Sequence, residues 1–309
     1  MRYAILADIH GNIDVLQAVL DETKNLGVDK YIFAGDYSGN LPYPNEVTDI
    51  LRNMDNAIIA KGNEEGYLDS SAQKDQSTWT DGQMQAHYWH YRKLTEENHK
   101  FLRGLPEVIK FSDSGVNITV THKSSDLYGT VEYNEFSSRK VAEKYQDNFE
   151  CREKILHDVQ DFASSNADFR AAVLPLDDGI YIFGHSHIQW HARLENKIFI
   201  NPGSCGIPLD GTPGAPYTLL EIENGNINIT ECRANYDIEK LIQNMKNSDL
   251  YKAAPVWSEI MLEQLTYCFE VARPFLDFTE QYANKIGDTA RPFSEKTWTE
   301  AYRQWKNNN

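Results

Sequence analysis

The sequence of 309 residues has no apolar run long enough to cross a membrane. A membrane helix needs roughly 18 consecutive apolar residues, and the longest runs here are far shorter. The N-terminus also lacks the features of a signal peptide, because the apolar run at residues 3–7 is too short and no small-residue cleavage site follows it. We therefore expect no membrane association and a cytoplasmic location.

The sequence is also poor in cysteine and in basic residues. None of its four cysteines belongs to a C-x-x-C unit, so neither a zinc ribbon nor a redox pair is indicated. Acidic residues outnumber basic ones by 46 to 30, which gives a formal net charge of -16. Because so acidic a chain is repelled by a phosphate backbone, we expect no general nucleic-acid binding. The oligomeric state is not indicated by the sequence.

Short apolar runs alternate with helical patterns along most of the chain. This alternation predicts an α/β fold with parallel strand pairing. We expect strands at residues 3–7, 31–34, 57–60, 116–121, 180–183 and 197–200, and a hairpin made by 217–222 and 226–230. Helical patterns cover residues 81–103, most of 124–171, and the chain from about 237 onward.

Polar side chains follow the ends of five of these predicted strands. They are Asp8, His10, Asp36, Asn63, His122, His185 and His187. Open α/β sheets place their ligands beyond the carboxyl ends of the strands, so we expect these groups to converge. Carboxylate, imidazole and amide ligands suit borderline divalent metals. Seven ligands can hold two ions if one carboxylate bridges them, and Asp36 is the natural bridge.

Each of these motifs is weak when taken alone. Gly35-Asp36 and Gly62-Asn63 are more often turns, and a single histidine such as His122 is more often a hydrogen-bonded side chain than a ligand. The unit Gly184-His185-Ser186-His187 is stronger, because two imidazoles follow a buried run. The metal-site interpretation therefore depends on all five motifs occurring together.

In combination, the motifs resemble those of the calcineurin-like metallophosphoesterases, and in particular the small bacterial phosphodiesterase-type members. They are Asp8-Ile9-His10-Gly11-Asn12, Gly35-Asp36, Gly62-Asn63-Glu64-Glu65, His122 and Gly184-His185-Ser186-His187, with Asn201-Pro202-Gly203-Ser204 after them. The resemblance spans roughly residues 1–235. It implies a four-layer fold of the α/β (α+β) class, in which helices flank a two-sheet β-sandwich. We expect helical insertions at about 66–110 and 124–175, and a helical C-terminal extension at 236–309 packed on the same domain.

The resemblance also implies a dinuclear centre with two divalent ions, for which manganese, iron, zinc, cobalt and nickel are all candidates. One ion would be held by Asp8, His10, Asp36 and His187, and the other by Asp36, Asn63, His122 and His185. The implied reaction is hydrolysis of a small phosphorylated substrate, preferably a phosphodiester, by attack of a metal-bridging hydroxide. Asp36, Asn63, His122 and Glu64 would be catalytic, and Asn12 and Lys123 would contact the substrate.

One departure from the family pattern concerns leaving-group chemistry. Many relatives have histidine after the asparagine of the third motif, and this sequence has Glu64. Two alternatives accompany the enzyme hypothesis: a non-catalytic metal-binding scaffold with the same fold, such as the retromer subunit, or a phosphatase of the family acting on nucleotides, dinucleoside polyphosphates or proteins. His87 and His90 share one helix face, and we expect that face to be solvated or part of a cap.

Overall fold

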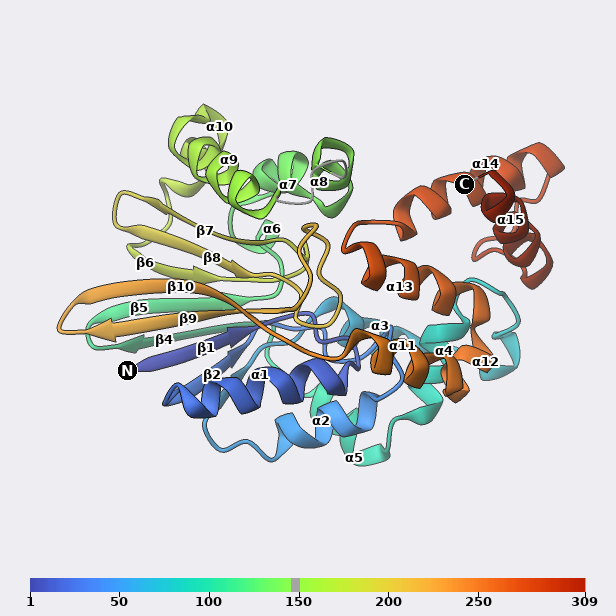
Figure 1. The fold of residues 1–309 in the computed structure, drawn as a ribbon, viewed down its shortest axis with the longest axis horizontal. Helices are drawn as coiled ribbons and strands as arrows, with labels where there is room; N and C mark the ends of the chain where they lie inside the picture. Colours follow the sequence, from blue (N-terminus) through green and yellow to red (C-terminus); the bar gives the residue numbers. More distant parts are fainter. Residues whose placement is uncertain (146–150, 309) are drawn as a thin grey trace.

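A computed structural model describes the backbone of residues 1–145 and 151–308. Within these ranges, ten strands form two five-stranded sheets (Figure 1). The first sheet has the order β10 (Asn226–Ala234), β9 (Ala215–Glu223), β1 (Arg2–Leu6), β2 (Lys30–Phe33) and β3 (Ala57–Ile59). The second has the order β4 (Val108–Asp113), β5 (Val116–Thr121), β6 (Gly179–Ile182), β8 (Lys197–Pro202) and β7 (Gln189–Leu194).

Helices flank the sheets in three groups (Figure 1). The first group is α1 (Ile13–Asn25), α2 (Pro44–Arg52), α3 (Asn63–Ala72), α4 (Gln85–Lys93) and α5 (Glu96–Arg103). The second group, over the second sheet, is α6 (Ser125–Tyr128), α7 (Val131–Phe136), α8 (Ser138–Tyr145), α9 (Cys151–Ser165) and α10 (Ala167–Val173). The third, at one end of the sheets, is α11 (Ile238–Asn247), α12 (Asp249–Ala253), α13 (Pro255–Tyr267), α14 (Ala272–Ile286) and α15 (Glu295–Asn308).

The alternation of side chains between the two faces of each strand explains why the sheets stack in layers. In β1, Tyr3 and Ile5 pack against the second sheet, while Ala4 and Leu6 face the core under α1. Side chains on opposite faces of a strand alternate, so one strand serves two cores. The isoleucines of β6 and β8 complete the layer between the sheets, and their aromatic residues pack under the helices of the second group. The expected two-sheet sandwich flanked by helices is confirmed.

The central strands are parallel, as the sequence predicts. β1 pairs with β2, β2 with β3, β5 with β6, and β6 with β8 in parallel. β9 pairs with β1 and β10, β4 with β5, and β7 with β8 in antiparallel fashion. All eight predicted strands are present with boundaries shifted by a few residues. The sequence prediction misses β4 and β7, which lie at the edges of the second sheet. β4 also lies partly inside the insertion expected at about 66–110.

The helical segment expected at 81–103 is present, but it consists of two helices. The structure divides this segment into α4 and α5, because Leu94 has an extended backbone and Thr95 caps α5 by accepting a hydrogen bond from the Asn98 amide. The helical character of 124–171 and of the chain after 237 is confirmed where the structure describes these segments; residues 146–150 lie outside the described part. Among the described helices, none has the length and apolar character needed to span a bilayer.

Candidate metal centre

Five of the seven predicted ligands have a positive φ, a backbone conformation that residues other than glycine rarely adopt. The φ angles are 53° for Asp8, 54° for His10, 60° for Asp36, 69° for His185 and 61° for His187. A left-handed conformation costs a non-glycine residue of order 1 kcal/mol or more. Such strain persists where the surrounding structure fixes it, and it gathers at functional sites. The tight turns after β1, β2 and β6 direct these side chains to the same edge of the sandwich.

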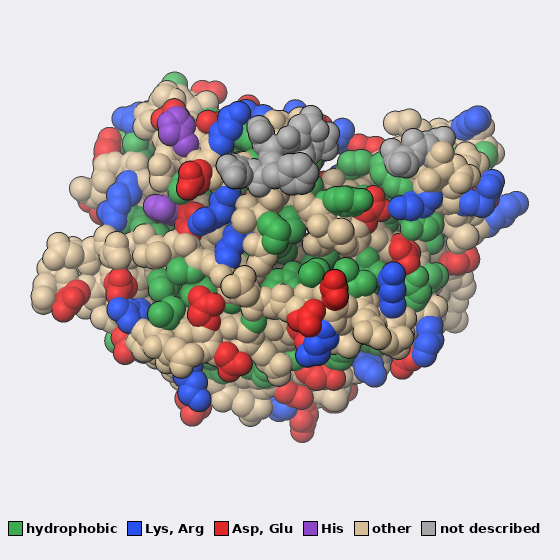
Figure 2. Space-filling view, in the orientation of Figure 1, with side chains coloured by type: hydrophobic (Ala, Val, Ile, Leu, Met, Phe, Trp, Pro, Cys, Tyr) green, Lys and Arg blue, Asp and Glu red, His purple; other side chains and the backbone are tan. Residues whose placement is uncertain are grey.

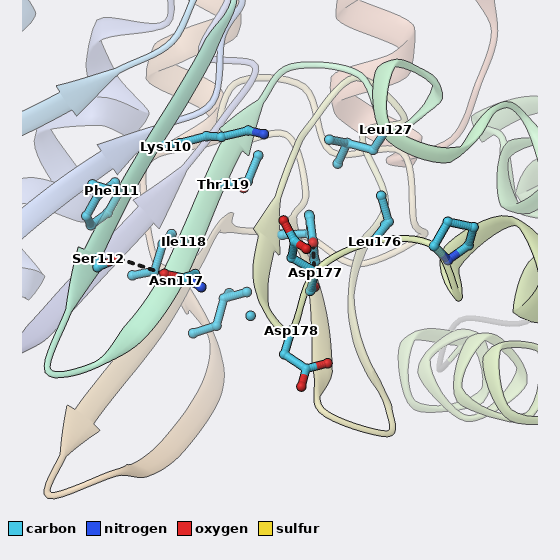
Figure 3. A pocket seen from close by; sticks show the side chains of 14 residues that line it. Lys110, Phe111, Ser112, Asn117, Ile118, Thr119, Leu127, Leu176, Asp177 and Asp178 are labelled. Atoms are coloured by element: carbon cyan, nitrogen blue, oxygen red, sulfur yellow. Dashed lines mark hydrogen bonds between the residues drawn. The ribbon is translucent and has the colours of Figure 1, made fainter.

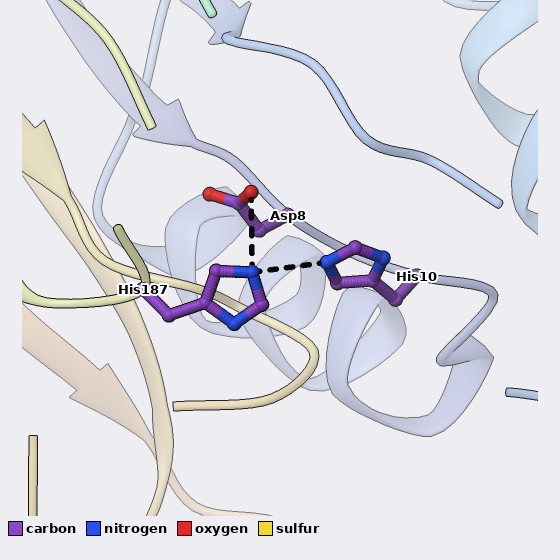
Figure 4. A group of neighbouring side chains, drawn as sticks. All are labelled: Asp8, His10 and His187. Atoms are coloured by element: carbon purple, nitrogen blue, oxygen red, sulfur yellow. Dashed lines mark hydrogen bonds and ion pairs between the residues drawn. The ribbon is translucent and has the colours of Figure 1, made fainter. Parts of the chain in front are cut away.

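One group of side chains joins the first and last motifs (Figure 4). The Nε2 atoms of His10 and His187 lie 3.1 Å apart, and His187 Nε2 lies 3.5 Å from a carboxylate oxygen of Asp8. His187 Nδ1 donates to the carbonyl of Ile207 at 2.9 Å. A carbonyl only accepts, so Nδ1 holds the proton and the Nε2 lone pair faces the group.

A second group centres on His122. Its Nδ1 donates to the carbonyl of Ala34 at 2.7 Å, which directs the Nε2 atom toward oxygen atoms of other motifs. Those oxygens are Asn63 Oδ1 at 3.0 Å, Asp36 Oδ2 at 3.2 Å and Asp8 Oδ1 at 3.9 Å. The His185 ring lies beside that of His122, with centroids 5.2 Å apart. The structure therefore brings all seven predicted ligands into one region.

The donor set of this region fits a cation. The oxygens around His122 Nε2 need a positive charge among them, which a protonated ring supplies without a metal and a bound cation would supply in its place. Burial alone would lower the pKa of His122, but the charges of Asp36 and Asp8 outweigh burial and raise that pKa to about 10. Burial lowers the pKa of His185 to about 4, so this imidazole is neutral, as a metal ligand must be.

The supporting hydrogen bonds come from residues beside the motifs. Asn201 donates to the Gly184 carbonyl at 2.8 Å, and Ser204 donates to the Asp8 carbonyl at 2.7 Å. The Asp8 carboxylate accepts from the His185 amide at 3.0 Å. These contacts tie the turns after β1, β6 and β8 together, which explains how the strained conformations are maintained.

A comparison with known proteins identifies the family of this chain. The model of the calcineurin-like phosphoesterase superfamily domain matches residues 1–225. The chain belongs to this family. An uncharacterized protein of Methanocaldococcus jannaschii is 26% identical over 269 residues, which cover 82% of this chain and 94% of that protein.

Two solved structures show the same fold. A metallophosphoesterase from Sphaerobacter thermophilus has a TM-score of 0.61 and 21% identity, and the match covers 87% of this chain and 100% of that one. A hypothetical protein from Pyrococcus horikoshii has a TM-score of 0.64 and 18% identity, with 87% and 99% covered. The resemblance drawn from the motifs is thus confirmed at the level of family and fold.

Glu65 belongs to the third motif, but the sequence assigned it no role in the candidate centre. Its side chain is fully buried, and its two oxygens accept from the backbone amides of Asp36, Tyr37 and Gly62 at 3.1, 2.9 and 2.9 Å. One carboxylate thus joins the second motif to the third. A glutamate three residues after Gly62 at the start of α3 is the one sequence signal for it.

His87 and His90 do not lie on a solvated face, which was one of the two settings expected for them. His90 is buried, and its Nδ1 accepts from the Gly39 amide at 3.3 Å. His87 lies inside as well, with Nε2 3.2 Å from a carboxylate oxygen of Glu64. Glu64 is itself almost buried, and its amide donates to Asp36 Oδ1 at 2.8 Å. The family's histidine position is therefore taken by a glutamate that is paired with an imidazole from α4.

Asn12 does not have the exposure expected of a substrate contact. The side chain is fully buried, Nδ2 donates to the Gly206 carbonyl at 3.0 Å, and Oδ1 accepts from the Val15 amide at 3.4 Å. Both ends of the amide are used inside the protein, so Asn12 caps α1 and braces a loop. The interpretation of Asn12 as substrate-binding is corrected on this ground.

Lys123 has a position that suits the substrate contact predicted for it. It lines a cavity of about 410 Å³ together with the predicted ligands Asn63 and His122, and with the exposed ring of Tyr67. A different cavity, of about 450 Å³, lies near the starts of β5 and β6 (Figure 3), whereas the predicted ligands follow the ends of these strands. Of the two, the first cavity borders the candidate centre.

The segment beyond the family match also reaches the centre. Trp257 of α13 donates from Nε1 to Asn40 Oδ1 at 2.9 Å. Asn40 Nδ2 lies 3.1 Å from His10 Nδ1, and the Ser38 carbonyl lies 3.2 Å from the same atom. The orientation of the His10 ring is thus supported partly by the C-terminal helices.

Proposed function

We propose that this protein is a metal-dependent phosphoesterase that holds two divalent ions and favours phosphodiesters. The observation that supports this most strongly is the set of His122 contacts, in which a ring nitrogen faces oxygens of Asn63, Asp36 and Asp8. The group around His10 and His187 supplies ligands for a second ion, with Asp8 and Asp36 available to bridge. Membership of a phosphoesterase family agrees with this chemistry.

When bound, the ions would supply Lewis-acid chemistry, neutralising charge on the phosphoryl oxygens and making water a nucleophile at neutral pH. The chain's own residues prepare the site for that role. Carbonyls of Ala34 and Ile207 fix the tautomers of His122 and His187, so both Nε2 atoms face the centre. Because these groups are held in place before substrate arrives, little reorganisation is needed during reaction.

A preference for esters with good leaving groups follows from the residue at position 64. Without an imidazole directly after Asn63, a poor leaving group would depart without a readily supplied proton. Esters with acidic leaving groups, such as p-nitrophenol, need no proton donor. We therefore expect diesters with good leaving groups to be turned over faster than simple alkyl monoesters.

The proposal is tested by loading the metal-stripped protein with metal and then measuring its phosphoesterase activity. The metal-stripped protein should bind two Mn²⁺ per chain by elemental analysis and hydrolyse bis-p-nitrophenyl phosphate only after loading. It should act more slowly on an alkyl monoester, as followed by phosphate release. Two bound ions without turnover of any ester would favour the non-catalytic scaffold, and no bound metal would refute the proposal.

Two unpaired cations border the site and should attract the substrate's phosphate. Among the described residues, neither Lys123 nor Arg273 of α14 has an ion-pair partner for its side chain. Burial lowers the pKa of His185, and the positive charges of Lys123 and Arg273 lower it further. The two cations are therefore close enough to His185 for their charges to act on its ring. On the face shown in Figure 2, acidic and basic side chains are interspersed.

Lys123→Gln and Arg273→Gln should each raise the KM for bis-p-nitrophenyl phosphate roughly threefold to tenfold, with a smaller effect on kcat, because a charge-assisted contact with substrate is lost. Lys285→Gln, which removes an exposed charge at the far end of α14, is the matched control and should change neither constant. Steady-state kinetics at fixed ionic strength measures these effects. An unchanged KM in both variants would show that these cations do not meet the substrate.

A further inference from the structure

Glu64 lies beside two of the predicted metal ligands. A carboxylate oxygen of Glu64, a ring nitrogen of His10 and a carboxylate oxygen of Asp36 all lie within 4.8 Å of one another. Two ligands of one ion, each about 2.0–2.2 Å from it, are separated by roughly 3–4 Å. The three atoms thus lie almost at coordination spacing.

The surroundings of Glu64 hold its carboxylate in this place. Its amide donates to Asp36 Oδ1, which fixes the start of the side chain. His87 Nε2 lies 3.2 Å from Oε2, and the His87 ring meets Tyr67 edge-on with centroids 5.3 Å apart. Because a carboxylate has two oxygens, one can contact His87 while the other faces the centre.

Gly39 provides the space that this placement requires. Its φ is 115°, and a Cβ added there would lie 2.4 Å from Glu64 Oε2. A residue with a side chain would therefore push the carboxylate away from its position. The absence of a side chain at Gly39 thus leaves room for the Glu64 carboxylate where it lies.

We propose that Glu64 is a metal ligand of this centre, held in position by His87. This inference builds on the proposed metal centre and changes the role assigned to Glu64 from the sequence, which was catalytic. An ionised carboxylate beside a cation binds it and cannot donate a proton. The family position that often holds an imidazole would here add a negative charge to the metal site, and His87 would act as a positioning residue.

The experiment measures metal binding and does not depend on turnover. Metal-stripped wild type, Glu64→Gln and His87→Gln are titrated with Mn²⁺, and free Mn²⁺ is followed by electron paramagnetic resonance. In Glu64→Gln, one of the two sites should weaken tenfold or more because a charged ligand is lost. His87→Gln should weaken the same site less, since the carboxylate remains but is no longer held.

Two further variants keep the result interpretable. Glu96→Gln makes the same change at an exposed position in the first turn of α5 and should leave both affinities unchanged. Glu64→Asp keeps the charge on a shorter side chain and should lose less affinity than Glu64→Gln. Thermal unfolding of the metal-free proteins verifies that each variant folds.

The outcomes separate this inference from the proposed function. If wild type binds Mn²⁺ and Glu64→Gln binds it with the same affinity at every site, Glu64 is not a ligand and only this inference fails. If Glu64→Gln does not fold, the other two variants decide the question. The inference is then overturned if both Glu64→Asp and His87→Gln bind Mn²⁺ with wild-type affinity. If wild type itself binds no Mn²⁺, the proposed metal centre is wrong.

Discussion

Asp36→Asn is expected to reduce hydrolysis by roughly a thousandfold while the fold survives. Asp36 is buried, one of its oxygens accepts from the Glu64 amide, and the other lies 3.2 Å from His122 Nε2. Asparagine has nearly the same shape, so the packing is retained. It lacks the charge needed to hold a cation between the two groups of ligands, and it can offer an NH₂ group where an acceptor is required.

The measurement is kcat/KM for bis-p-nitrophenyl phosphate, with metal content determined on the same preparation. Asp55→Asn, an exposed change of the same chemistry, is the matched control and should retain full activity. We expect Asp36→Asn to lose bound metal together with activity. Retention of more than a tenth of the activity would show that Asp36 is not central to the reaction.

Glu65→Ala is expected to lower the free energy of unfolding by about 3 kcal/mol. The substitution leaves the buried amides of Asp36, Tyr37 and Gly62 without their acceptor. Burial and the nearby charge of Asp36 raise the pKa of Glu65 to about 7, so the ionised form of this side chain is destabilised in the folded protein. Three unsatisfied amides outweigh the relief of that cost, since each buried donor left unpaired costs about 1–3 kcal/mol.

Urea denaturation of the metal-free protein tests this prediction without interference from bound ions. Glu46→Ala, which removes an exposed glutamate from the first turn of α2, should change stability by no more than about 0.5 kcal/mol. Equal stability of Glu65→Ala and Glu46→Ala would mean that the amides find other partners, and that Glu65 does not join the two motifs.

The central strands could be predicted because each is a short apolar run that ends in a turn. The strands β4 and β7 could not, because neither contains such a run. β4 alternates between exposed and half-buried residues, and β7 includes glutamine, histidine and arginine. The break between α4 and α5 did have a local signal, because Thr95 is a good helix cap.

The candidate ligands were predictable for a related reason: each follows a predicted strand, and parallel strands bring their carboxyl ends together. The roles of Glu64, Glu65 and His87 could not be predicted in this way. Each depends on a partner from another motif or from a helix whose position is set by tertiary packing. His87 in particular reaches Glu64 only because α4 packs against α3.

The hydrogen bonds from Trp257 to Asn40, and from Asn40 toward His10, limit how freely the C-terminal segment can be exchanged. In a chimera that joined residues 1–235 to the tail of another family member, the transplanted tail would have to provide an indole, or an equivalent donor, at the same place. Otherwise Asn40 would be free to rotate, and the ring of His10 would lose a neighbour that orients it. The C-terminal segment and the first motif would therefore have to be exchanged together for the His10 ring to keep its orientation.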